Sequence, residues 1–415
     1  MASDTHDHAA LGEAPNPSLV SRPSTQRGKA ATGRIGSYVF VLPWEPNVIG
    51  GVSGVVRNLA KAMLEGGSLT PTIAINSWDD PRARQSADSV KFRFSLFGAM
   101  TAVGVLKAIV TSPLCLWRTY HLLRECDARA VNFHFPGIAP FGVAVLKRLG
   151  AFRGKLILSY HGTDVAAPAG LLERRIHAFV VRSADHLVAC SHALASRLAS
   201  QIAVPDSRVE VIANGVDASV FDGIGKPGTI LPQPLPSSFI VSVGAFIARK
   251  NHLLLLRAFA LLKDRYPALH LCIAGADGDE REAVEREIRR QGAAGRVHLL
   301  LELDQFQVAL LLSKATLCIQ TSLAESFPLA VLEASSSGIP LVVSDIPGHQ
   351  EMVRSGSTGT LFPLDDPAAC ADAIVRVLDQ PEASARMAAT LRARVRRDFT
   401  WASCMRQYER LVGPA

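Results

Sequence analysis

Short apolar runs alternate with amphipathic stretches along most of the chain, and this alternation is the pattern of parallel β-α-β units. Before the middle of the chain, the runs that predict strands are Tyr38–Leu42, Thr72–Ile75, Ala130–Phe135, Leu156–Tyr160, His186–Ala189 and Val209–Ile212. After it they are Ser238–Val243, His270–Ala274, Val297–Leu300, Leu317–Gln320, Pro340–Val343 and Thr360–Phe362. The helices predicted between these strands include Gly54–Leu64, Leu106–Leu123, His192–Ile202, Leu253–Leu262, Glu280–Gln291, Asp304–Leu312, Leu329–Ser336 and Pro367–Leu378. The pattern therefore predicts two doubly wound α/β domains in tandem.

The alternation is interrupted by a stretch dense in Gly and Pro, which predicts a domain linker at 223–236. Residues 1–35 carry Ser, Thr, Pro, Ala and His without a repeating apolar face, so we expect a flexible tail there. The tail also lacks the continuous apolar stretch of a secretory signal. The expected organisation is the tail, an N-terminal Rossmann-like domain at 36–222, the linker, a C-terminal Rossmann-like domain at 237–386 and a C-terminal helix at 387–415.

Length and composition agree with this picture. A chain of 415 residues is too long for one ordinary core, and 48% hydrophobic with 20% charged residues describes a globular protein. The seven cysteines are dispersed, without a CxxC pair or a Cys-His cluster. This argues against a disulfide framework and against a structural zinc site.

The positive charge is concentrated in the first half. Residues 36–222 hold 19 Lys and Arg against 14 Asp and Glu, whereas residues 223–415 hold 21 against 20. A basic surface suits an anionic membrane or a phosphate-linked substrate, although a solvated surface without a partner explains it equally well. No nucleic acid is expected, because no helix-turn-helix, RRM or zinc-finger signature accompanies the charge. The apolar stretch Phe94–Trp117 contains Lys107 and Pro113, so it predicts a buried or membrane-surface helix rather than a membrane-spanning one.

The sharpest local motif is a pair of glutamates, Glu325 and Glu333, separated by seven residues. Ser326 suits the N-cap of the following helix, which would leave backbone N–H groups at Ser326 and Phe327 available to a phosphate. Glu333 could accept hydrogen bonds from paired sugar hydroxyls. The spacing alone is also compatible with two charges on a helix surface.

A second motif places Arg249 and Lys250 just after the strand that ends near Gly244. At the mouth of a strand, two cations can clamp a diphosphate, although such pairs in surface loops are often merely solvated. Nearer the N-terminus, the glycines at 50, 51 and 54 lie between a strand and a helix, where they let the backbone approach a phosphate. They do not form the GxGxxG pattern, so a dehydrogenase is disfavoured.

Two further segments follow strands of the first half. His161 lies in Ser159–Asp164 beside Gly162, in a position where a histidine can touch a substrate, although a lone His more often has only a structural role. Asn214–Asp217 predicts a turn that shapes the wall of a cleft.

Together these segments resemble the retaining glycosyltransferases of family 4, which have the GT-B fold of two Rossmann-like domains facing a central cleft. The resemblance covers roughly Ser37 to Val412. The matching pieces are GGVSG at 50–54, HGTD at 161–164, NGVD at 214–217, the segment 244–251, ESFPLAVLE at 325–333, SGIPLVVSDIPGHQEMV at 337–353 and FTWASCMRQYERLV at 399–412. Several ordered motifs at consistent separations are far more specific than any one of them.

The resemblance implies that the first domain binds the acceptor and that the second domain holds the donor site for a nucleotide diphosphate sugar. Glu333 would bind the ribose hydroxyls, and Lys250 with Arg249 would neutralise the diphosphate. Glu325 would contact the transferred sugar. The backbone of Ser326–Phe327 would contact the sugar or a phosphate.

The resemblance also assigns roles outside this segment. The Gly51 backbone would reach the diphosphate from the first domain, and His161 would line the reacting face near the anomeric carbon. The strand Val297–Leu300 would hold the base, and the final helix near 401–411 would cross back onto the first domain. Many relatives have an Arg where this chain has Ala245, so either Arg249 substitutes for it or the phosphate clamp is weaker.

The implied activity is transfer of a sugar to an acceptor hydroxyl with retained anomeric configuration. Because no carboxylate is evident as a covalent nucleophile, a same-face displacement is expected. The segments expected to bind the donor contain no Asp-x-Asp motif, so we expect no bound metal and no other cofactor. The donor sugar is expected to be a hexose, such as mannose, from a GDP- or UDP-sugar. The acceptor is expected to be a glycan or a lipid-diphosphate-linked glycan in exopolysaccharide or lipopolysaccharide assembly, with Asn132 and His134 as acceptor contacts. The enzyme would then be cytoplasmic and peripheral on the inner membrane face. A non-catalytic subunit that binds sugar nucleotides and a sugar-nucleotide epimerase remain the alternatives.

Overall fold

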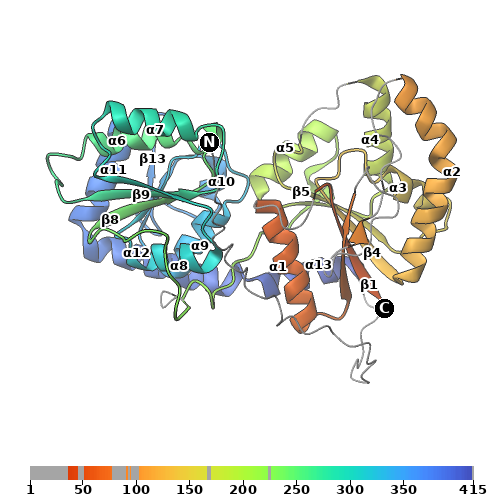
Figure 1. Ribbon diagram of the computed structural model, residues 1–415. Helices are drawn as coiled ribbons and strands as arrows, with labels where there is room; N and C mark the ends of the chain where they lie inside the picture. The colour runs from red at the N-terminus through yellow and green to blue at the C-terminus, as the bar shows by residue number, and fades with distance from the viewer. Residues whose placement is uncertain are drawn as a thin grey trace, which may run out of the picture. The chain divides into compact units, whose positions relative to one another are not determined.

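The computed structural model describes residues 36–44, 51–76, 90–91, 94, 102–165, 170–222 and 226–413. The predicted tail, Gly50, the beginning of the predicted linker and part of the Phe94–Trp117 stretch lie outside the described residues. Within the described ranges, the chain forms two parallel sheets, each covered by helices (Figure 1). This architecture confirms the predicted fold class.

The first sheet has seven parallel strands in the order β3-β2-β1-β4-β5-β6-β7. The strands are β1 (Ser37–Leu42), β2 (Thr70–Ile75), β3 (Val90–Lys91), β4 (Ala128–His134), β5 (Lys155–Tyr160), β6 (His186–Ala189) and β7 (Val209–Val211). The accompanying helices are α1 (Gly51–Gly66), α2 (Ala102–Glu125), α3 (Phe141–Arg148), α4 (Leu171–Ser183), α5 (His192–Ile202) and the 3-10 turn η1 (Asp206–Arg208). The strand order reverses between β1 and β4, and such a switch point is where doubly wound sheets bind ligands.

The second sheet has six parallel strands in the order β10-β9-β8-β11-β12-β13. They are β8 (Phe239–Val243), β9 (His270–Gly275), β10 (Val297–Leu301), β11 (Cys318–Gln320), β12 (Leu341–Ser344) and β13 (Thr360–Phe362). Its helices are η2 (Ala248–Lys250), α6 (His252–Ala260), α7 (Arg281–Arg290), α8 (Gln305–Lys314), α9 (Leu329–Ser337), α10 (Pro347–Gln350), α11 (Pro367–Asp379), α12 (Pro381–Asp398) and α13 (Trp401–Val412). The switch point of this sheet lies between β8 and β11.

The strands form where the sequence has continuous apolar runs because both faces of each sheet are covered. All five residues of β8 are buried, for example, and so are all six residues of β1. A strand buried on both sides reads as an unbroken apolar run rather than an alternating one. The predicted strands agree with the observed ones to within two residues at each end.

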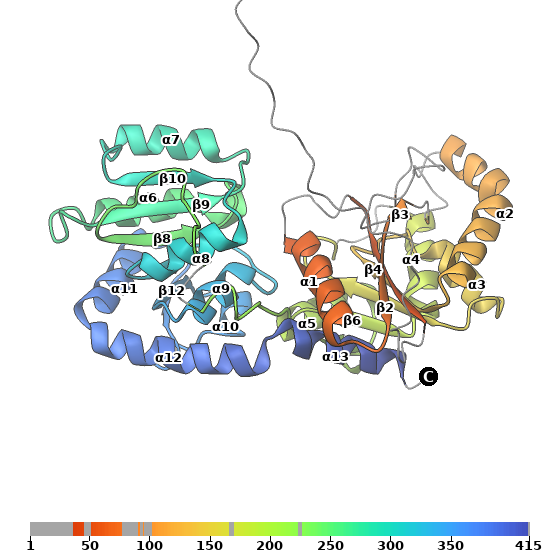
Figure 2. The same ribbon diagram turned by 60° about the horizontal axis from the view of Figure 1, so that its bottom comes forward.

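The last helix, α13, packs against α1 and the first sheet rather than against the second sheet that precedes it (Figure 2). Its buried residues Trp401, Met405 and Tyr408 share a hydrophobic cluster with Leu59 and Met63 of α1. The segment 387–413 therefore contains the end of α12 followed by all of α13, not one helix. The domain boundaries themselves stay predictions.

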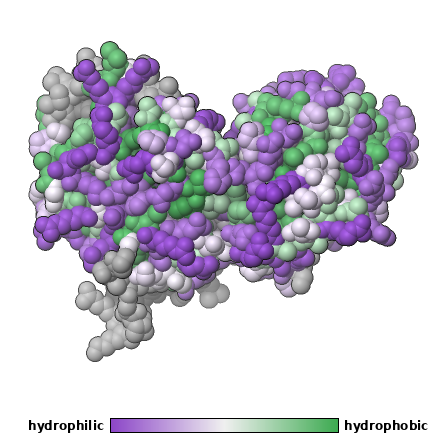
Figure 3. All heavy atoms as spheres, turned by 180° about the vertical axis from the view of Figure 1, so that it is seen from behind, coloured by the Kyte–Doolittle hydropathy of each residue, from purple (hydrophilic) through white to green (hydrophobic). Residues whose placement is uncertain are grey.

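The surface carries apolar groups in scattered patches. On the face seen in Figure 3, these patches alternate with hydrophilic side chains. Among the described residues, no helix has both the length and the apolarity needed to cross a bilayer.

Candidate active site

A cavity of about 570 Å³ is lined by residues that follow strands of both sheets. Its size lies within the usual range for small-molecule sites. All of the predicted catalytic and donor-binding residues line it: Gly51, His161, Arg249, Lys250, Glu325, Ser326, Phe327 and Glu333. Segments from the first turn of α1 to α9 therefore meet at one site. Asn214 and Asp217, predicted to shape the cleft wall, line it as well.

On the part of the cavity wall that the second sheet provides, the central feature is an ion pair between Lys250 and Glu325. Lys250 Nζ lies 2.7 Å from Glu325 Oε1, and both side chains are largely buried. Ser322 Oγ donates to the same oxygen over 2.9 Å. Burial alone would raise the pKa of Glu325, but the charge and hydrogen bond of Lys250, followed by the charge of Arg249, bring this pKa below its ordinary value. Glu325 is therefore an anion near neutral pH, and the pair is preorganised in the cavity.

The turn η2 positions Lys250. Asn251 ends this turn in the left-handed conformation, with φ of 53°, and Thr321 Oγ1 donates to the carbonyl oxygens of Lys250 and Asn251. A Cβ atom on Gly244 would lie 3.0 Å from Lys250 Cδ, so glycine at this position leaves room for the lysine stem. A Cβ on Gly275 would collide with the Gly244 carbonyl, and the neighbouring strand can therefore approach closely only with glycine there.

Glu333 lies in the second turn of α9, and burial raises its pKa to about 7, with the charge of Lys250 acting in the opposite direction. The side chain lines the cavity. A carboxyl group with a pKa near 7 is only partly ionised at neutral pH. Its ability to accept two hydrogen bonds from hydroxyls therefore depends on pH in this range.

The prediction that Ser326 caps the helix is wrong. Helix α9 begins at Leu329, Pro328 occupies its N-cap position, and no side chain caps it. The residue before a proline is disfavoured in helical conformation, which keeps Phe327 out of the helix. Ser326 instead faces the first half of the chain, because a Cβ atom on Gly162 would collide with Ser326 Oγ.

The loop that carries His161 is held by Asp164 and Arg197. The carboxylate of Asp164 accepts hydrogen bonds from the backbone N–H groups of His161 and Gly162, at 3.0 and 2.7 Å. Arg197 Nη2 donates to the Gly162 carbonyl over 2.6 Å. Burial lowers the pKa of His161 to about 4, so its imidazole is neutral at physiological pH.

The first two turns of α1 also line the cavity. Gly51, Gly54, Arg57 and Asn58 line the cavity, so the positive end of this helix faces it. A Cβ atom on Gly51 would meet nothing within 4 Å, and sterics do not require glycine there in this conformation.

Asn132 and His134 were predicted as acceptor contacts, but the structure does not bring them to the cavity wall. Both side chains are buried in the first sheet, at 0% and 1% exposure. Asn132 donates to the Tyr38 hydroxyl over 3.1 Å and accepts from Ser159 Oγ over 2.8 Å. Partners contributed by other segments satisfy this amide, which argues against direct acceptor contact in the conformation described.

Sequence reasoning missed several residues of the site. Arg57 adds a third cation to Arg249 and Lys250 at the cavity, on the helix whose first turn contains the predicted Gly51. Glu302 lines the cavity directly after β10, in the left-handed conformation with φ of 54°, and its carboxylate accepts the backbone N–H of Asp277 over 2.8 Å. A charged residue that follows a strand predicted to hold the base is a signal that could have identified Glu302.

Two other features shape the glutamate loop. A Cβ atom on Gly348 would collide with the Glu325 carbonyl, so the backbone of α10 packs directly on this loop. Glu351 Oε1 accepts the backbone N–H of Ala193, at the start of α5, over 3.0 Å. Within the described ranges, no group of three or more His, Cys, Asp or Glu side chains is arranged to hold a metal ion.

Comparison with known proteins agrees with this geometry. The family described as "Glycosyltransferase Family 4" matches residues 49–220, and "Glycosyl transferases group 1" matches residues 230–394. The chain is 26% identical over 387 residues to a glycogen synthase of Mycobacterium tuberculosis (strain CDC 1551 / Oshkosh), covering 88% of this chain and 91% of the relative. It is 30% identical over 233 residues to a D-inositol 3-phosphate glycosyltransferase of Streptomyces scabiei (strain 87.22), covering 54% of this chain and 52% of the relative.

Solved structures share the fold. A glycosyltransferase from Rickettsia africae ESF-5 aligns with a TM-score of 0.72 at 15% identity. The alignment covers 92% of this chain and 99% of the Rickettsia chain. HepE from Anabaena, solved with UDP and glucose, has a TM-score of 0.68 at 17% identity, with coverages of 90% and 98%. The two family matches cover all of the second sheet and every strand of the first sheet except β1, and they include every residue of the cavity's charged centre. The chain belongs to the family 4, group 1 glycosyltransferases, retaining enzymes of GT-B fold that use nucleotide sugar donors.

Proposed function

We propose that this enzyme transfers a hexose from a nucleotide diphosphate sugar to a hydroxyl group of a glycan or lipid-linked acceptor, and that the cavity described above is its donor site. The observation that carries the proposal is the buried Lys250–Glu325 pair at 2.7 Å, with Glu333 and Arg249 in the same cavity. In this arrangement Glu325 contacts the transferred sugar, Glu333 binds the ribose hydroxyls and the cations bind the diphosphate.

The charges suit departure of a nucleoside diphosphate. Cleavage of the bond between the sugar and the phosphate develops negative charge on the leaving oxygen, and Lys250 and Arg249 lie at the same cavity. Arg57 supplies a further cation from α1, which compensates for Ala245 in our proposal. The backbone of Gly51 and the first turn of α1 add the positive end of a helix.

The reaction itself is proposed to be a same-face displacement. The acceptor hydroxyl attacks the anomeric carbon from the side that the diphosphate leaves, and the departing phosphate oxygen accepts the proton of that hydroxyl. In this proposal, the negative charge of Glu325, which Lys250 holds in place, stabilises the positive charge that develops on the anomeric carbon.

A panel of sugar nucleotides tests the donor. Thermal shift with GDP- and UDP-linked hexoses should identify one donor, because a ligand that binds only the folded state raises the melting temperature. Transfer from that donor should then give a product of unchanged anomeric configuration by NMR. If no nucleotide sugar raises the melting temperature, the proposed donor site is refuted.

Donor affinity is expected to depend on pH through Glu333. Its pKa of about 7 leaves it protonated below neutrality, where it is a poorer acceptor for ribose hydroxyls. The dissociation constant of the nucleotide sugar, measured by calorimetry, should therefore fall by up to about tenfold between pH 6 and pH 8. A nucleotide sugar is the right probe because its diphosphate, unlike that of UDP, has no ionisation near pH 7.

Glu333→Gln provides the control for this pH dependence. The variant should bind more weakly at pH 8 and show a flat profile. In the ligand-free protein, folding raises the pKa of Glu333 from its ordinary value of 4.5 to about 7. The unfolded state therefore binds fewer protons between these two pH values, so this group lowers the stability across that window, and the loss is complete above pH 7. The variant should therefore melt at a higher temperature than the wild type at pH 8 but not at pH 4. An unchanged pH profile in the variant would exclude Glu333 as the titrating group.

The acceptor side is proposed to contact an anionic membrane through α2. Val110, Leu114 and Trp117 are 72%, 51% and 58% exposed, and their spacing puts them on one face of this helix. The same face continues to Arg124. An exposed apolar stripe that ends in a cation suits the interfacial region of a bilayer.

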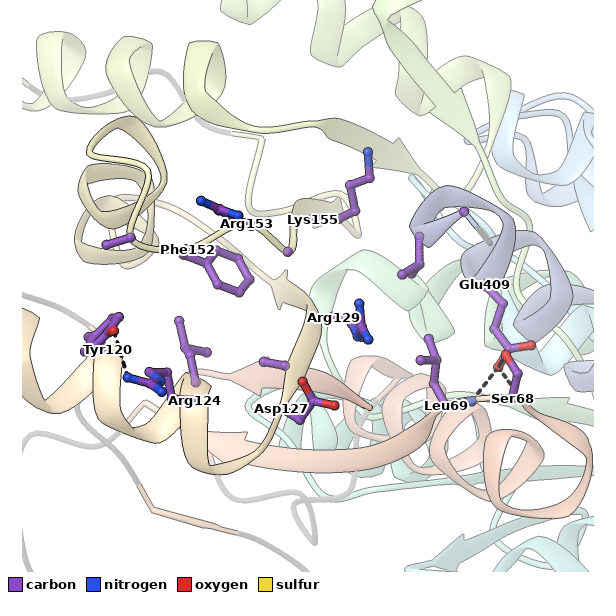
Figure 4. A pocket seen from close by; sticks show the side chains of 16 residues that line it. Ser68, Leu69, Tyr120, Arg124, Asp127, Arg129, Phe152, Arg153, Lys155 and Glu409 are labelled. Atoms are coloured by element: carbon purple, nitrogen blue, oxygen red, sulfur yellow. Dashed lines mark hydrogen bonds between the residues drawn. The ribbon is translucent and has the colours of Figure 1, made fainter. Parts of the chain in front are cut away.

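A basic cavity of about 1000 Å³ adjoins the end of this stripe, at the amino ends of β4 and β5 (Figure 4). Arg124, Arg129, Arg153 and Lys155 line it, against the carboxylates of Asp127 and Glu409. Glu409 already accepts hydrogen bonds from Ser68, toward which it points in Figure 4. The excess of positive charge favours a phosphate headgroup of a lipid.

Vesicle flotation tests this contact. The enzyme should float with vesicles that contain anionic lipid and remain unbound with purely zwitterionic vesicles. Trp117→Ala and the pair Arg153→Glu with Lys155→Glu should each reduce the bound fraction several-fold. Charge reversal of Lys263 and Arg286, two exposed cations of the second half, is the matched control and should have little effect. Indifference of binding to lipid charge would contradict the proposal.

A further inference from the structure

His134, which the mechanism above does not use, makes direct contact with the site histidine His161. His134 Nδ1 lies 2.8 Å from His161 Nε2. The two ring planes are inclined at 21° and their centroids are 5.1 Å apart, which suits a hydrogen bond between the ring edges. His134 is the last residue of β4 and is 1% exposed, whereas His161 follows β5 and lines the donor cavity. A buried imidazole therefore stands directly behind a cavity-lining one.

The surroundings of His134 leave its ring little freedom. Phe40 and Tyr408 pack near it, with ring centroids 5.8 and 6.4 Å away. Its second nitrogen, Nε2, is buried and has no hydrogen-bond partner among the described residues. The contact to His161 is therefore the polar interaction that remains for this side chain.

Only one proton can lie between the two nitrogens of the contact. Burial lowers the pKa of both histidines, so both rings are neutral at physiological pH and each carries one N–H. If His161 donates through Nε2, His134 carries its own proton on Nε2, where a buried N–H has no acceptor. If His134 donates through Nδ1, only an acceptor lone pair of Nε2 is left unpaired. Orphaned buried N–H donors are rarer than unpaired acceptors, so the second arrangement is favoured.

We propose that His134 is a positioning residue: it donates its Nδ1–H to His161 Nε2 and thereby fixes His161 with its proton on Nδ1. Nδ1 of His161, which is the nitrogen left to contact a ligand, is then a hydrogen-bond donor. His161 would donate to an oxygen of the transferred sugar or of the leaving phosphate, and it would not act as a general base. The catalytic contact of His161 in this inference rests on the proposed donor site. The tautomers of the two histidines do not depend on that proposal.

The tautomers can be measured without any substrate. In the full-length wild-type protein with ¹⁵N-labelled histidine, long-range ¹H–¹⁵N correlations distinguish Nδ1–H from Nε2–H rings. The spectra of His134→Asn and His161→Ala identify the two signals among the twelve histidines. We expect both rings to carry the proton on Nδ1 at pH 7.5. A proton on Nε2 of His134 would overturn the proposal.

A pair of amide substitutions separates positioning from packing. The amide of Asn places an N–H near the Nδ1 position of histidine, and that of Gln places it near Nε2. His134→Asn should therefore keep most of kcat, whereas His134→Gln and His134→Leu should lose about tenfold, the equivalent of one hydrogen bond, with little change in KM for the donor. Equal loss in the Asn and Gln variants would contradict the proposal.

The activities of the His161→Ala and His134→Leu variants separate this inference from the proposed function. If His161→Ala keeps wild-type activity, the assignment of His161 to the reacting face fails, even where the measured tautomers are those expected. If His161→Ala loses activity but His134→Leu does not, the proposed function survives and the positioning role of His134 is refuted.

Discussion

Replacing Lys250 by alanine is expected to lower kcat/KM about 100-fold, a loss of about 3 kcal/mol of transition-state stabilisation. The ammonium group lies in the cavity, where water does not screen it fully, and its 2.7 Å contact with Glu325 holds it in place before the reaction begins. Its charge acts most strongly when the diphosphate departs. Steady-state transfer kinetics with the donor found in the panel measure this loss.

The same substitution leaves Glu325 buried without its cation, which by itself destabilises the fold. Lys250→Ala combined with Glu325→Gln removes this unpaired charge and should recover much of the melting temperature while activity stays low. Lys263→Ala, at an exposed lysine of the same half, should leave kinetics unchanged. If Lys250→Ala turns over at close to the wild-type rate, Lys250 is not the residue that neutralises the diphosphate.

Replacing Gly162 by alanine is expected to reduce kcat/KM by about two orders of magnitude, because the new methyl group would collide with Ser326 Oγ. The loop that carries His161 would then have to move away from the glutamate loop. Gly162 also has φ of 131°, a conformation that L-residues rarely adopt. Kinetics and thermal melting together measure the two effects.

The backbone strain can be separated from the collision with a second glycine. Gly150 also has positive φ, at 72°, but a Cβ atom there would meet nothing within 4 Å. Gly150→Ala should therefore lower the melting temperature without a comparable loss of activity. Ser326→Gly, which removes the colliding oxygen, should restore part of the activity of Gly162→Ala. If the two alanine variants have similar activity, the contact between Gly162 and Ser326 has no role in catalysis.

The fold could be predicted from the sequence because the strands are buried on both faces and therefore appear as continuous apolar runs. The short edge strand β3, with only Val90 and Lys91, gives no such run and was not predicted. The start of α9 was misread because Ser326 has the chemistry of an N-cap, but two residues later Pro328 restricts the backbone before it. At this position the steric restriction imposed by Pro328 outweighs the capping chemistry of Ser326.

The charged centre of the site could also be anticipated, since Lys250, Glu325 and Glu333 each lie in a recognisable segment. The burial of Asn132 and His134 away from the cavity wall could not be anticipated. Both are polar residues near the end of a strand, and the sequence does not reveal which distant side chains will satisfy them. Asn132 finds its partners in Tyr38 and Ser159, and Tyr408 of the final helix contacts Ser159 in turn.

The final helix, α13, follows the second sheet in the chain but packs on α1 and the first sheet, so the first sheet is completed only when the whole chain has been made. The chain returns from the second sheet to complete the first one, and Tyr408 reaches the hydroxyl of Ser159 beneath the strand that leads to His161. A fragment ending before residue 230 would expose the apolar side of α1, including Leu59 and Met63, to water. Evolution or engineering that exchanges the second sheet and its helices for another such unit must therefore keep α13 with the first sheet. The segment that can be exchanged lies between β7 and α13.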